Sequence, residues 1–221
     1  GPGVYYRDLL GMPEDTCFRS LPGPFTRDQL EVNFTPDIST RRPDRERSLT
    51  PIAELIHRQY QQRPGNYLAF FSSFSYLNRV QETLLQQAPD LPLRAQRPGM
   101  SAEERTAFLK AFHEDNTGVA LAVLGGVFSE GIDLPGDRLI GAFVATLGLP
   151  PFDNWHEILR QRLEQRFGAG HAYTYLIPGL QKVAQAAGRV IRTPEDTGVI
   201  WLIDDRFLQP QIRNLLPAWW A

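Results

Sequence analysis

Two guanidinium groups stand three residues apart near the carboxyl end of the chain. Residues 185–192 read QAAGRVIR, so that Arg189 and Arg192 follow Gly188, and Gln185 lies one helical turn before Arg189. On a helix this spacing places Gln185 and both arginines on one face. Planar, permanently charged donors of this kind stabilise the charge that develops on a transferring phosphoryl group. A basic helix surface would give the same pattern, and for this segment alone we prefer that plainer interpretation.

An acidic loop precedes this segment. Residues 129–136 read SEGIDLPG and include Glu130, Gly131 and Asp133. The glycine spacing there is that of a phosphate loop, but Ile132 and Asp133 stand where a lysine and a hydroxyl are required. Because a carboxylate at this place would repel a triphosphate, we expect that the chain does not cradle ATP by itself.

The last apolar run of the chain is followed by Asp204, Asp205 and Arg206. Carboxylates at a strand end hold magnesium in phosphate-loop ATPases, but that interpretation needs the loop that this chain lacks. We therefore favour an ion pair between one of the aspartates and Arg206 or another arginine. None of the four histidines stands at metal-ligand spacing from a carboxylate or a cysteine, so we expect no metal site.

Composition limits what the chain can bind. With 42% hydrophobic and 22% charged residues over 221 positions, it can form one large domain or two small ones. Its formal net charge of −2 argues against holding DNA by bulk electrostatics, so we expect only local contacts. Residues 40–48 (TRRPDRERS) could be a phosphate-binding arm, although we prefer a solvated loop. The longest apolar run, residues 119–128, has about half of the ~20 residues that a membrane span needs.

The elements that must position these groups alternate along the chain. Apolar runs typical of buried parallel strands occupy residues 67–71, 119–124, 139–146, 173–177 and 199–203, and residues 29–34 alternate like a further short strand. Helices are predicted from Thr50-Pro51, near residues 77–88, after a capping box at residues 101–104, and near residues 158–163 and 180–191. This alternation predicts an α/β fold with a doubly wound, mostly parallel sheet and helices on both faces. Ligands of such sheets bind beyond the carboxyl ends of the strands, which points to the loops after Phe71, Leu124 and Thr146.

Together and in this order, the motifs resemble the second RecA-like domain of superfamily 2 helicases of the DinG/XPD branch. Residues 67–76 (YLAFFSSFSY) look like motif IV, residues 96–112 like the glutamine-plus-helix segment after it, residues 128–136 like motif V, and residues 185–192 like motif VI. Residues 147–150 (LGLP) and 216–220 (LPAWW) also fit the branch. The resemblance covers roughly residues 5–220. Ser129 departs from it, because the branch often has a bulkier residue there.

The resemblance implies a RecA-like (P-loop NTPase-like) fold and a motor that binds ATP and Mg²⁺ between two RecA-like domains. Arg189 and Arg192 would reach the γ-phosphate as arginine fingers, and Gln185 and Asp133 would orient them or the nucleotide. The other residues implied at the ATP site are Glu130, Gly131 and Gly188. Ser72, Ser73 and Tyr76 would contact the backbone of single-stranded DNA.

Further expectations concern the parent protein. The branch implies a 5′–3′ DNA helicase with a role in DNA repair, in the bacterial cytoplasm on the nucleoid, whose partners are single-stranded DNA and the first RecA-like domain of the same chain, with no membrane. ATP and Mg²⁺ would be bound mainly by that first domain, and any iron–sulphur cluster would belong to it. We expect this chain alone to hydrolyse no ATP. The alternative is a catalytically silent RecA-like docking module, which would have little reason to keep both Arg189 and Arg192 beside Gly188.

The ends of the chain carry weaker signals. Residues 1–3 (GPG) look like the remnant of a cleaved tag, residues 4–48 like an irregular lead-in packed on the domain, and residues 49–221 like the motor domain itself. Cys17, the single cysteine, excludes an internal disulfide, fits a reducing compartment and is expected to be a buried or incidental thiol. Trp219 and Trp220 could stack on bases, but we expect them to pack on the core.

Overall fold

The fold is built on one sheet of six strands that all run parallel. The computed structural model describes residues 2–19, 21, 25–110, 112, 117–128, 139–191, 193 and 195–220. The strands lie in the order β1-β6-β5-β2-β4-β3. Their bounds are Leu30–Phe34 (β1), Asn66–Phe71 (β2), Leu93–Ala95 (β3), Gly118–Val123 (β4), Gly141–Ala145 (β5) and Gly198–Leu202 (β6). The predicted α/β class with a parallel sheet is confirmed.

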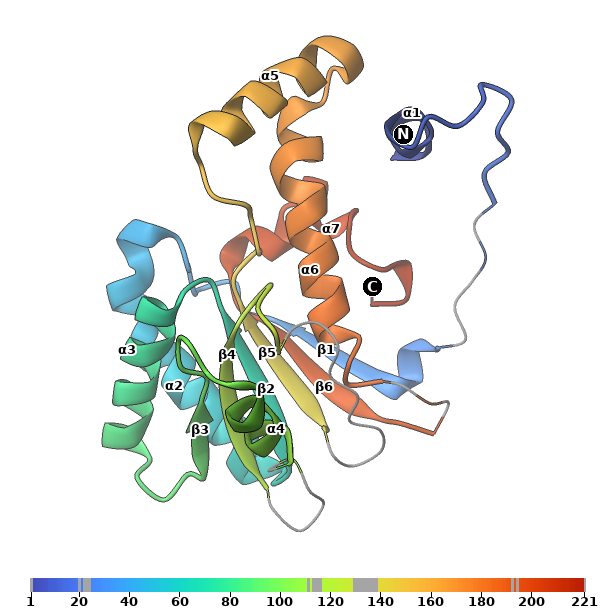
Figure 1. The fold of residues 1–221 in the computed structure, drawn as a ribbon. Helices are drawn as coiled ribbons and strands as arrows, with labels where there is room; N and C mark the ends of the chain where they lie inside the picture. Colours follow the sequence, from blue (N-terminus) through green and yellow to red (C-terminus); the bar gives the residue numbers. More distant parts are fainter. Residues whose placement is uncertain are drawn as a thin grey trace.

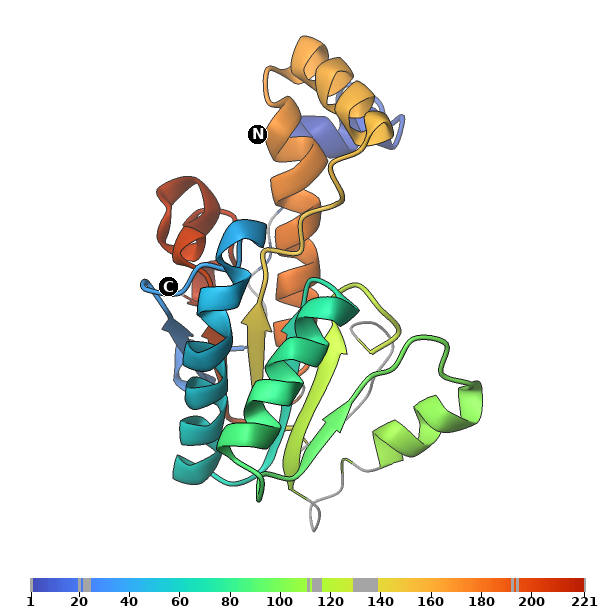
Figure 2. The same ribbon diagram turned by 90° about the vertical axis from the view of Figure 1, so that its left-hand side faces the viewer.

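Helices cover both faces of this sheet, as Figures 1 and 2 show. On one face lie α2 and α3, and on the other lie α4 and α6. The α-helices are Pro2–Leu9 (α1), Arg45–Gln62 (α2), Phe74–Gln87 (α3), Ala102–Lys110 (α4), Asn154–Phe167 (α5), Ile177–Ala187 (α6) and Pro210–Arg213 (α7). The capping box before α4 is present, because Ser101 N donates to Glu104 Oε2 (2.8 Å) and Glu104 N donates to Ser101 Oγ (3.2 Å).

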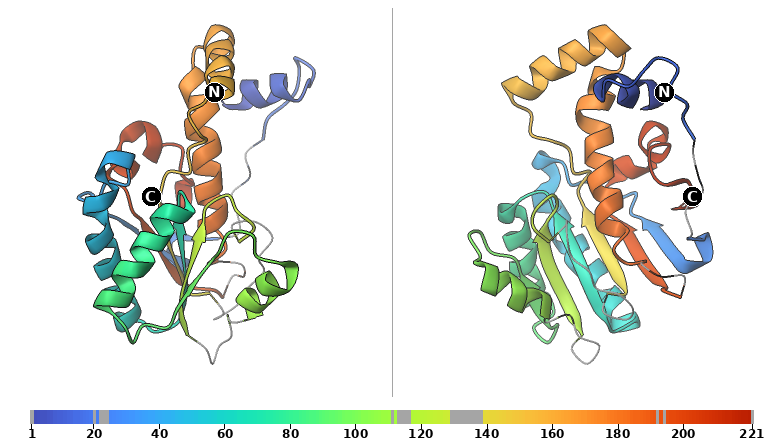
Figure 3. Two further views of the ribbon diagram at one scale, coloured as in Figure 1. Left: turned by 60° about the vertical axis from the view of Figure 1, so that its left-hand side comes forward. Right: turned by 45° about the vertical axis from the view of Figure 1, so that its right-hand side comes forward.

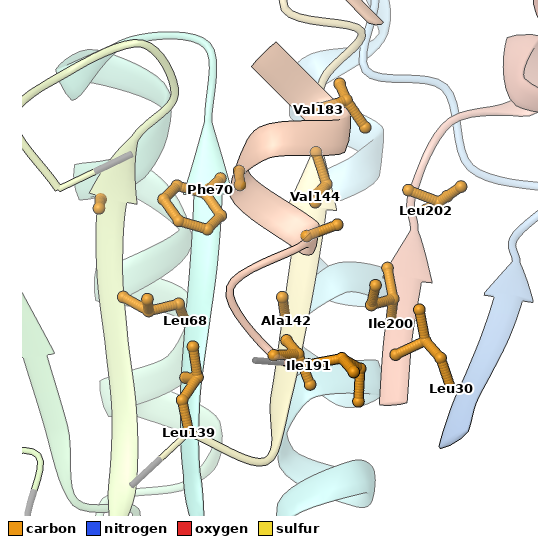
Figure 4. Close-up of a cluster of buried hydrophobic side chains, with 14 of the residues drawn as sticks. Leu30, Leu68, Phe70, Leu139, Ala142, Val144, Val183, Ile191, Ile200 and Leu202 are labelled. Carbon is orange, nitrogen blue, oxygen red and sulfur yellow. The ribbon is translucent and has the colours of Figure 1, made fainter. Parts of the chain in front are cut away.

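The two faces of the sheet bury two separate apolar clusters. All six residues of β2 are buried, and their side chains alternate between the clusters. Leu68 and Phe70 pack with α6, as Figure 4 shows, whereas Tyr67, Ala69 and Phe71 pack with α2 and α3. A strand buried on both faces gains apolar contacts at every position, which explains the unbroken apolar runs of the sequence.

Helix α2 begins earlier than the sequence suggested. It starts at Arg45, after the 3-10 turn Arg42–Asp44, and Pro51 lies inside it. Ser48 anchors this first part, because its hydroxyl donates to Arg45 O (2.7 Å) and lies 2.5 Å from the hydroxyl of Tyr76. The lead-in predicted to be irregular also contains α1. The short strand predicted at residues 29–34 is confirmed as β1, which pairs with β6 in the sheet. Residues 40–48 are therefore not a solvated loop.

The predicted strand at residues 173–177 is wrong. This segment is the π-helical turn η4 (Ala172–Leu176), which continues directly into α6. Its aromatic side chains pack sideways on distant partners: Tyr173 stacks on Tyr5 with ring centroids 4.1 Å apart, and Tyr175 stacks on Phe152 at 4.5 Å. These contacts explain why a segment of strand-forming residues is helical here.

Helix α5 and the start of α6 form a hairpin that projects beyond the sheet, and α1 packs beside it (Figure 3). The end of the chain returns to the core: Trp220 is buried among the residues of the α6-side cluster, and Trp219 packs against that cluster. The expectation that these two tryptophans pack on the core is confirmed.

Candidate functional site

Those predicted site residues that the structure describes lie at two opposite edges of the sheet. Ser72 and Ser73 directly follow the carboxyl end of β2. Gln185 lies in the last turn of α6, which ends at the amino ends of β5 and β6: a Cβ on Gly198 would lie 2.1 Å from Val190 Cγ1 and 2.9 Å from Ile140 O. Among the described site residues, the serines lie beyond the carboxyl ends as expected, whereas Gln185 lies at the opposite edge. We call the two sites the carboxyl edge and the amino edge.

At the amino edge, Arg189 does not stand on a helix. Helix α6 ends at Ala187, and Gly188 is its C-cap with φ −63° and ψ −3°. The prediction of a helix to residue 191 is wrong because Val190 and Ile191 turn inward and are buried. Arg189 itself is only 9% exposed, so this guanidinium is held within the edge and is not part of an open basic surface.

Gln185 and Gly188 complete the described part of the amino edge. The side chain of Gln185 is exposed. A Cβ on Gly188 would meet Ala184 O at 3.0 Å and Gln185 O at 3.8 Å, both in its own helix, and no other described segment comes within 4 Å. Gly188 thus ends α6, and we see no close approach of a second backbone. Arg192, Asp133, Gly131 and Glu130 lie outside the described residues.

At the carboxyl edge, two of the three predicted DNA contacts have structural roles. Ser73 is the N-cap of α3 and accepts from Tyr76 N at 3.3 Å. Tyr76 is 1% exposed, its hydroxyl bonds to Ser48 Oγ, and burial raises the pKa of its phenol. The core covers the ring of Tyr76 in this structure, and its expected contact with a DNA backbone stays a prediction. Ser72 is exposed.

Sequence reasoning missed Arg45, the partner of Ser72. Its Nη2 donates to Ser72 Oγ at 2.8 Å, its Nε donates to Thr40 O at 3.3 Å, and its guanidinium carbon lies 5.1 Å from the ring centroid of Tyr76. Burial lowers the pKa of Arg45, and the positive charges of Arg42 and Arg206 lower it further. The signal in the sequence was the arginine run at residues 40–48, which we interpreted as solvated.

Asp204 fixes the geometry behind Arg45. This carboxylate is 0% exposed and accepts from Thr40 N (2.8 Å), Thr40 Oγ1 (2.5 Å), Arg206 Nε (2.6 Å) and Arg206 Nη2 (2.9 Å). Burial alone would raise the pKa of Asp204, but the hydrogen bonds from Arg206 and Thr40 outweigh it and the pKa is lowered. The favoured ion pair between an aspartate and Arg206 is confirmed, and Arg41 pairs with Asp205 at 2.5 Å.

An exposed aromatic surface lies beside the carboxyl edge. Phe152 is 72% exposed and Trp155 is 65% exposed, at the start of the projecting hairpin. A groove of about 590 Å³ is lined by Phe152 and His171 from the hairpin and by Arg206 and Gln209 from the segment after β6. No pattern in the sequence distinguished these aromatics from core residues.

Two further elements bear on the site. Gln96 Oε1 accepts from Val123 N at 2.8 Å, and Phe108 of α4 packs on Phe128 with ring centroids 4.4 Å apart, so both fix the start of the loop after β4. Within the described ranges, no three histidine, cysteine or carboxylate side chains are grouped to hold a metal ion, and no helix is long and apolar enough to cross a membrane. Cys17 is exposed.

Known proteins resemble the chain along most of its length. The sequence model of the family described as "Helicase C-terminal domain" matches residues 56–221. The chain is 30% identical over 160 residues to the ATP-dependent DNA helicase XPD of Sulfolobus acidocaldarius, covering 70% of this chain and 27% of that protein. It is 29% identical over 215 residues to a probable ATP-dependent helicase of Methanocaldococcus jannaschii, covering 86% of this chain and 31% of that protein. The chain thus spans less than a third of either relative.

Solved structures agree on the fold. The chain superposes on apo XPD with a TM-score of 0.70 and 24% identity, over 85% of this chain and 38% of that one. It superposes on domain 2 of the Mss116p DEAD-box helicase with a TM-score of 0.51 and 16% identity, over 85% of this chain and 58% of that one. At these identities the likeness shows the fold alone, and that fold is the predicted RecA-like one.

Proposed function

Because this chain belongs to the helicase C-terminal domain family, as an XPD-type superfamily 2 domain, we propose that it is the second motor domain of an ATP-dependent DNA helicase. The observation that carries the proposal is the separation of the two edges. A motor must bind nucleotide and strand at different places and couple them, and the described motif residues Ser72 and Gln185 lie at opposite ends of the sheet, which supports the proposal. Its partner is the first RecA-like domain of the same parent chain.

The amino edge faces the nucleotide in this proposal. Arg189 and Arg192 are the arginine fingers, Gln185 orients them, and the remaining residues of the ATP site are Asp133, Gly131, Glu130 and Gly188. A guanidinium suits the γ-phosphate because it is a permanently charged, planar donor. Mg²⁺ usually takes one or two carboxylates together with phosphate oxygens, and we assign it mainly to the first domain.

The carboxyl edge faces the DNA. Ser72 is exposed there, and Phe152 and Trp155 offer two exposed aromatic faces on which bases could stack. The 5′–3′ polarity of the DinG/XPD branch, a role in DNA repair, a cytoplasmic location on the nucleoid and an iron–sulphur cluster in the parent protein are parts of the same proposal.

The test is single-strand-stimulated ATP hydrolysis by the parent protein. Arg189→Ala should abolish it, because an arginine delivered to the transferring phosphoryl group contributes roughly 10³–10⁵ in rate. Arg58→Ala is the matched control, since Arg58 is an exposed arginine of α2 that lies outside all the motif segments. If Arg189→Ala melts like the parent and hydrolyses ATP at the parental rate, the amino edge is not an ATP site.

A further inference from the structure

The surface beside the carboxyl edge carries more arginines than carboxylates can neutralise. Six arginines lie on or next to it: Arg41, Arg42, Arg45, Arg47, Arg79 and Arg206. Four of them each form an ion pair with a carboxylate: Arg41–Asp205, Arg47–Asp44, Arg79–Glu46 and Arg206–Asp204. Within the described part of the chain, Arg42 and Arg45 have no carboxylate partner. Asp37 lines a pocket with Asp44 and Arg47 on the same surface, so the excess is one positive charge, although the whole chain has a net charge of −2.

Arg45 is held in one orientation before any ligand arrives. Its Nε and Nη2 donate to Thr40 O and Ser72 Oγ, and the ring of Tyr76 lies under its guanidinium. Thr40 is in turn fixed by two hydrogen bonds to the buried Asp204. The remaining nitrogen, Nη1, makes no hydrogen bond to a described residue, so it is left to donate to a ligand. The lowered pKa of Arg45, caused by burial and then by Arg42 and Arg206, agrees with a local excess of positive charge.

Ser72 supplies a second donor beside this nitrogen. Its oxygen accepts from Arg45, which leaves its own O–H to donate, and the side chain is exposed. A preorientated guanidinium and a hydroxyl fit one tetrahedral oxyanion, because charge-assisted hydrogen bonds to phosphate oxygens are the strong ones. We propose that Arg45 and Ser72 form a phosphate-binding site, with Thr40, Asp204 and Tyr76 as positioning residues and Arg42 as a nearby charge.

The phosphate is assigned to the backbone of a nucleic-acid strand, which rests on the function proposed above. Arg206, whose positive charge acts on Arg45, lines a groove together with Phe152 and Glu164, and the ring of Phe152 is 72% exposed. A single strand presents phosphates and base faces side by side, whereas a free phosphate ion has no use for the aromatic part. The arginine run of the sequence then has a function at its third arginine, Arg45.

The test is strand binding by the 221-residue chain. Fluorescence anisotropy with a labelled oligothymidine should show Arg45→Ala and Ser72→Ala binding more weakly, by about tenfold for the arginine. The slope of log affinity against log salt should fall by about 0.7 in Arg45→Ala, the value for one lost phosphate contact to a single strand. Arg47→Ala is the matched control, because Arg47 is an exposed arginine of the same helix already paired with Asp44. Ser72→Ala is the second variant, since an exposed serine is not needed for folding.

A second arm separates the site from the proposed function. Inorganic phosphate should raise the melting temperature of the unaltered chain and of Arg47→Ala, but not that of Arg45→Ala. If phosphate stabilises the chain through Arg45 while no strand binds, the phosphate site stands and the strand assignment fails. If a strand binds equally to all variants, the proposed site is wrong. It is also wrong if Arg45→Ala changes neither the strand affinity nor the rise in melting temperature with phosphate.

Discussion

Replacing Asp204 by asparagine should remove the charge that holds the carboxyl edge together. Each carboxylate oxygen accepts from nitrogen or hydroxyl donors: Oδ1 from Arg206 N and Nε, and Oδ2 from Arg206 Nη2 and both donors of Thr40. In asparagine an NH₂ group replaces one of these oxygens. Whichever way the amide is turned, this NH₂ group then faces N–H or O–H donors and cannot accept from them. Arg206 would also lose its counter-charge.

The magnitude follows from burial. Breaking a buried ion pair by removing one partner costs about 3–5 kcal/mol. Asp204 is fully buried, but the side chain of Arg206 is 20% exposed and can regain some hydration. We therefore expect Asp204→Asn to lower the free energy of unfolding by about 3 kcal/mol, near the lower end of that range.

Urea unfolding at pH 7, followed by circular dichroism, measures this difference. Asp205→Asn is the control, because its pair with Arg41 is 36% and 37% exposed and should be worth at most about 1 kcal/mol. The pKa of Asp204 is lowered in the fold, so its stabilisation is present above the unfolded pKa of about 3.9 and is lost as the pH falls through the folded pKa. The difference in the free energy of unfolding between Asp204→Asn and the unaltered chain should thus stay constant from about pH 7 to 5. It should disappear only below about pH 4. If Asp204→Asn lowers the free energy of unfolding no more than Asp205→Asn does, the reasoning is refuted.

Three more results are expected. The isolated chain should hydrolyse no ATP above background, with or without single-stranded DNA, because it has no phosphate loop; a DNA-stimulated rate in a steady-state assay would contradict the proposed half-motor. In the parent protein, Arg189→Lys should fail nearly as badly as Arg189→Ala in the ATPase assay, since an ammonium lacks the planar fork, and a rate near the parental one would show that charge alone suffices. Tyr76→Phe should cost about 1 kcal/mol in urea unfolding through the lost hydrogen bond to Ser48, but should leave oligothymidine binding unchanged because phenylalanine keeps the ring under Arg45; weakened binding would support the Tyr76 hydroxyl as a DNA contact.

The fold could be predicted where burial leaves a pattern in consecutive residues. β2 and β4 are apolar along nearly their whole length because helices cover both sides of the sheet, whereas a strand with one face in water would alternate apolar and polar residues. The ion pair of Asp204 with Arg206 could be predicted because the two residues are neighbours in the sequence. The capping box at Ser101 is equally local.

The errors arose where a residue's partner is distant in the sequence. Tyr173 and Tyr175 are strand-forming residues, but the rings that hold them belong to Tyr5 and Phe152. Arg45 looked like part of a solvated run, because its contacts with Ser72 and the carbonyl of Thr40 appear only when β2 and the segment after β1 come together.

Helix α6 has a mechanical consequence. Its Gly179 touches the residues that leave the carboxyl end of β5, with a Cβ there only 2.6 Å from Leu147 O, and its last turn reaches the amino edge. Eleven helical residues span about 16 Å, and α6 packs one face on the core while Gln181 and Gln185 stay exposed. A displacement of Arg189 would therefore be expected to shift α6 along its axis. The hairpin at the other end of the helix would then move by a similar distance.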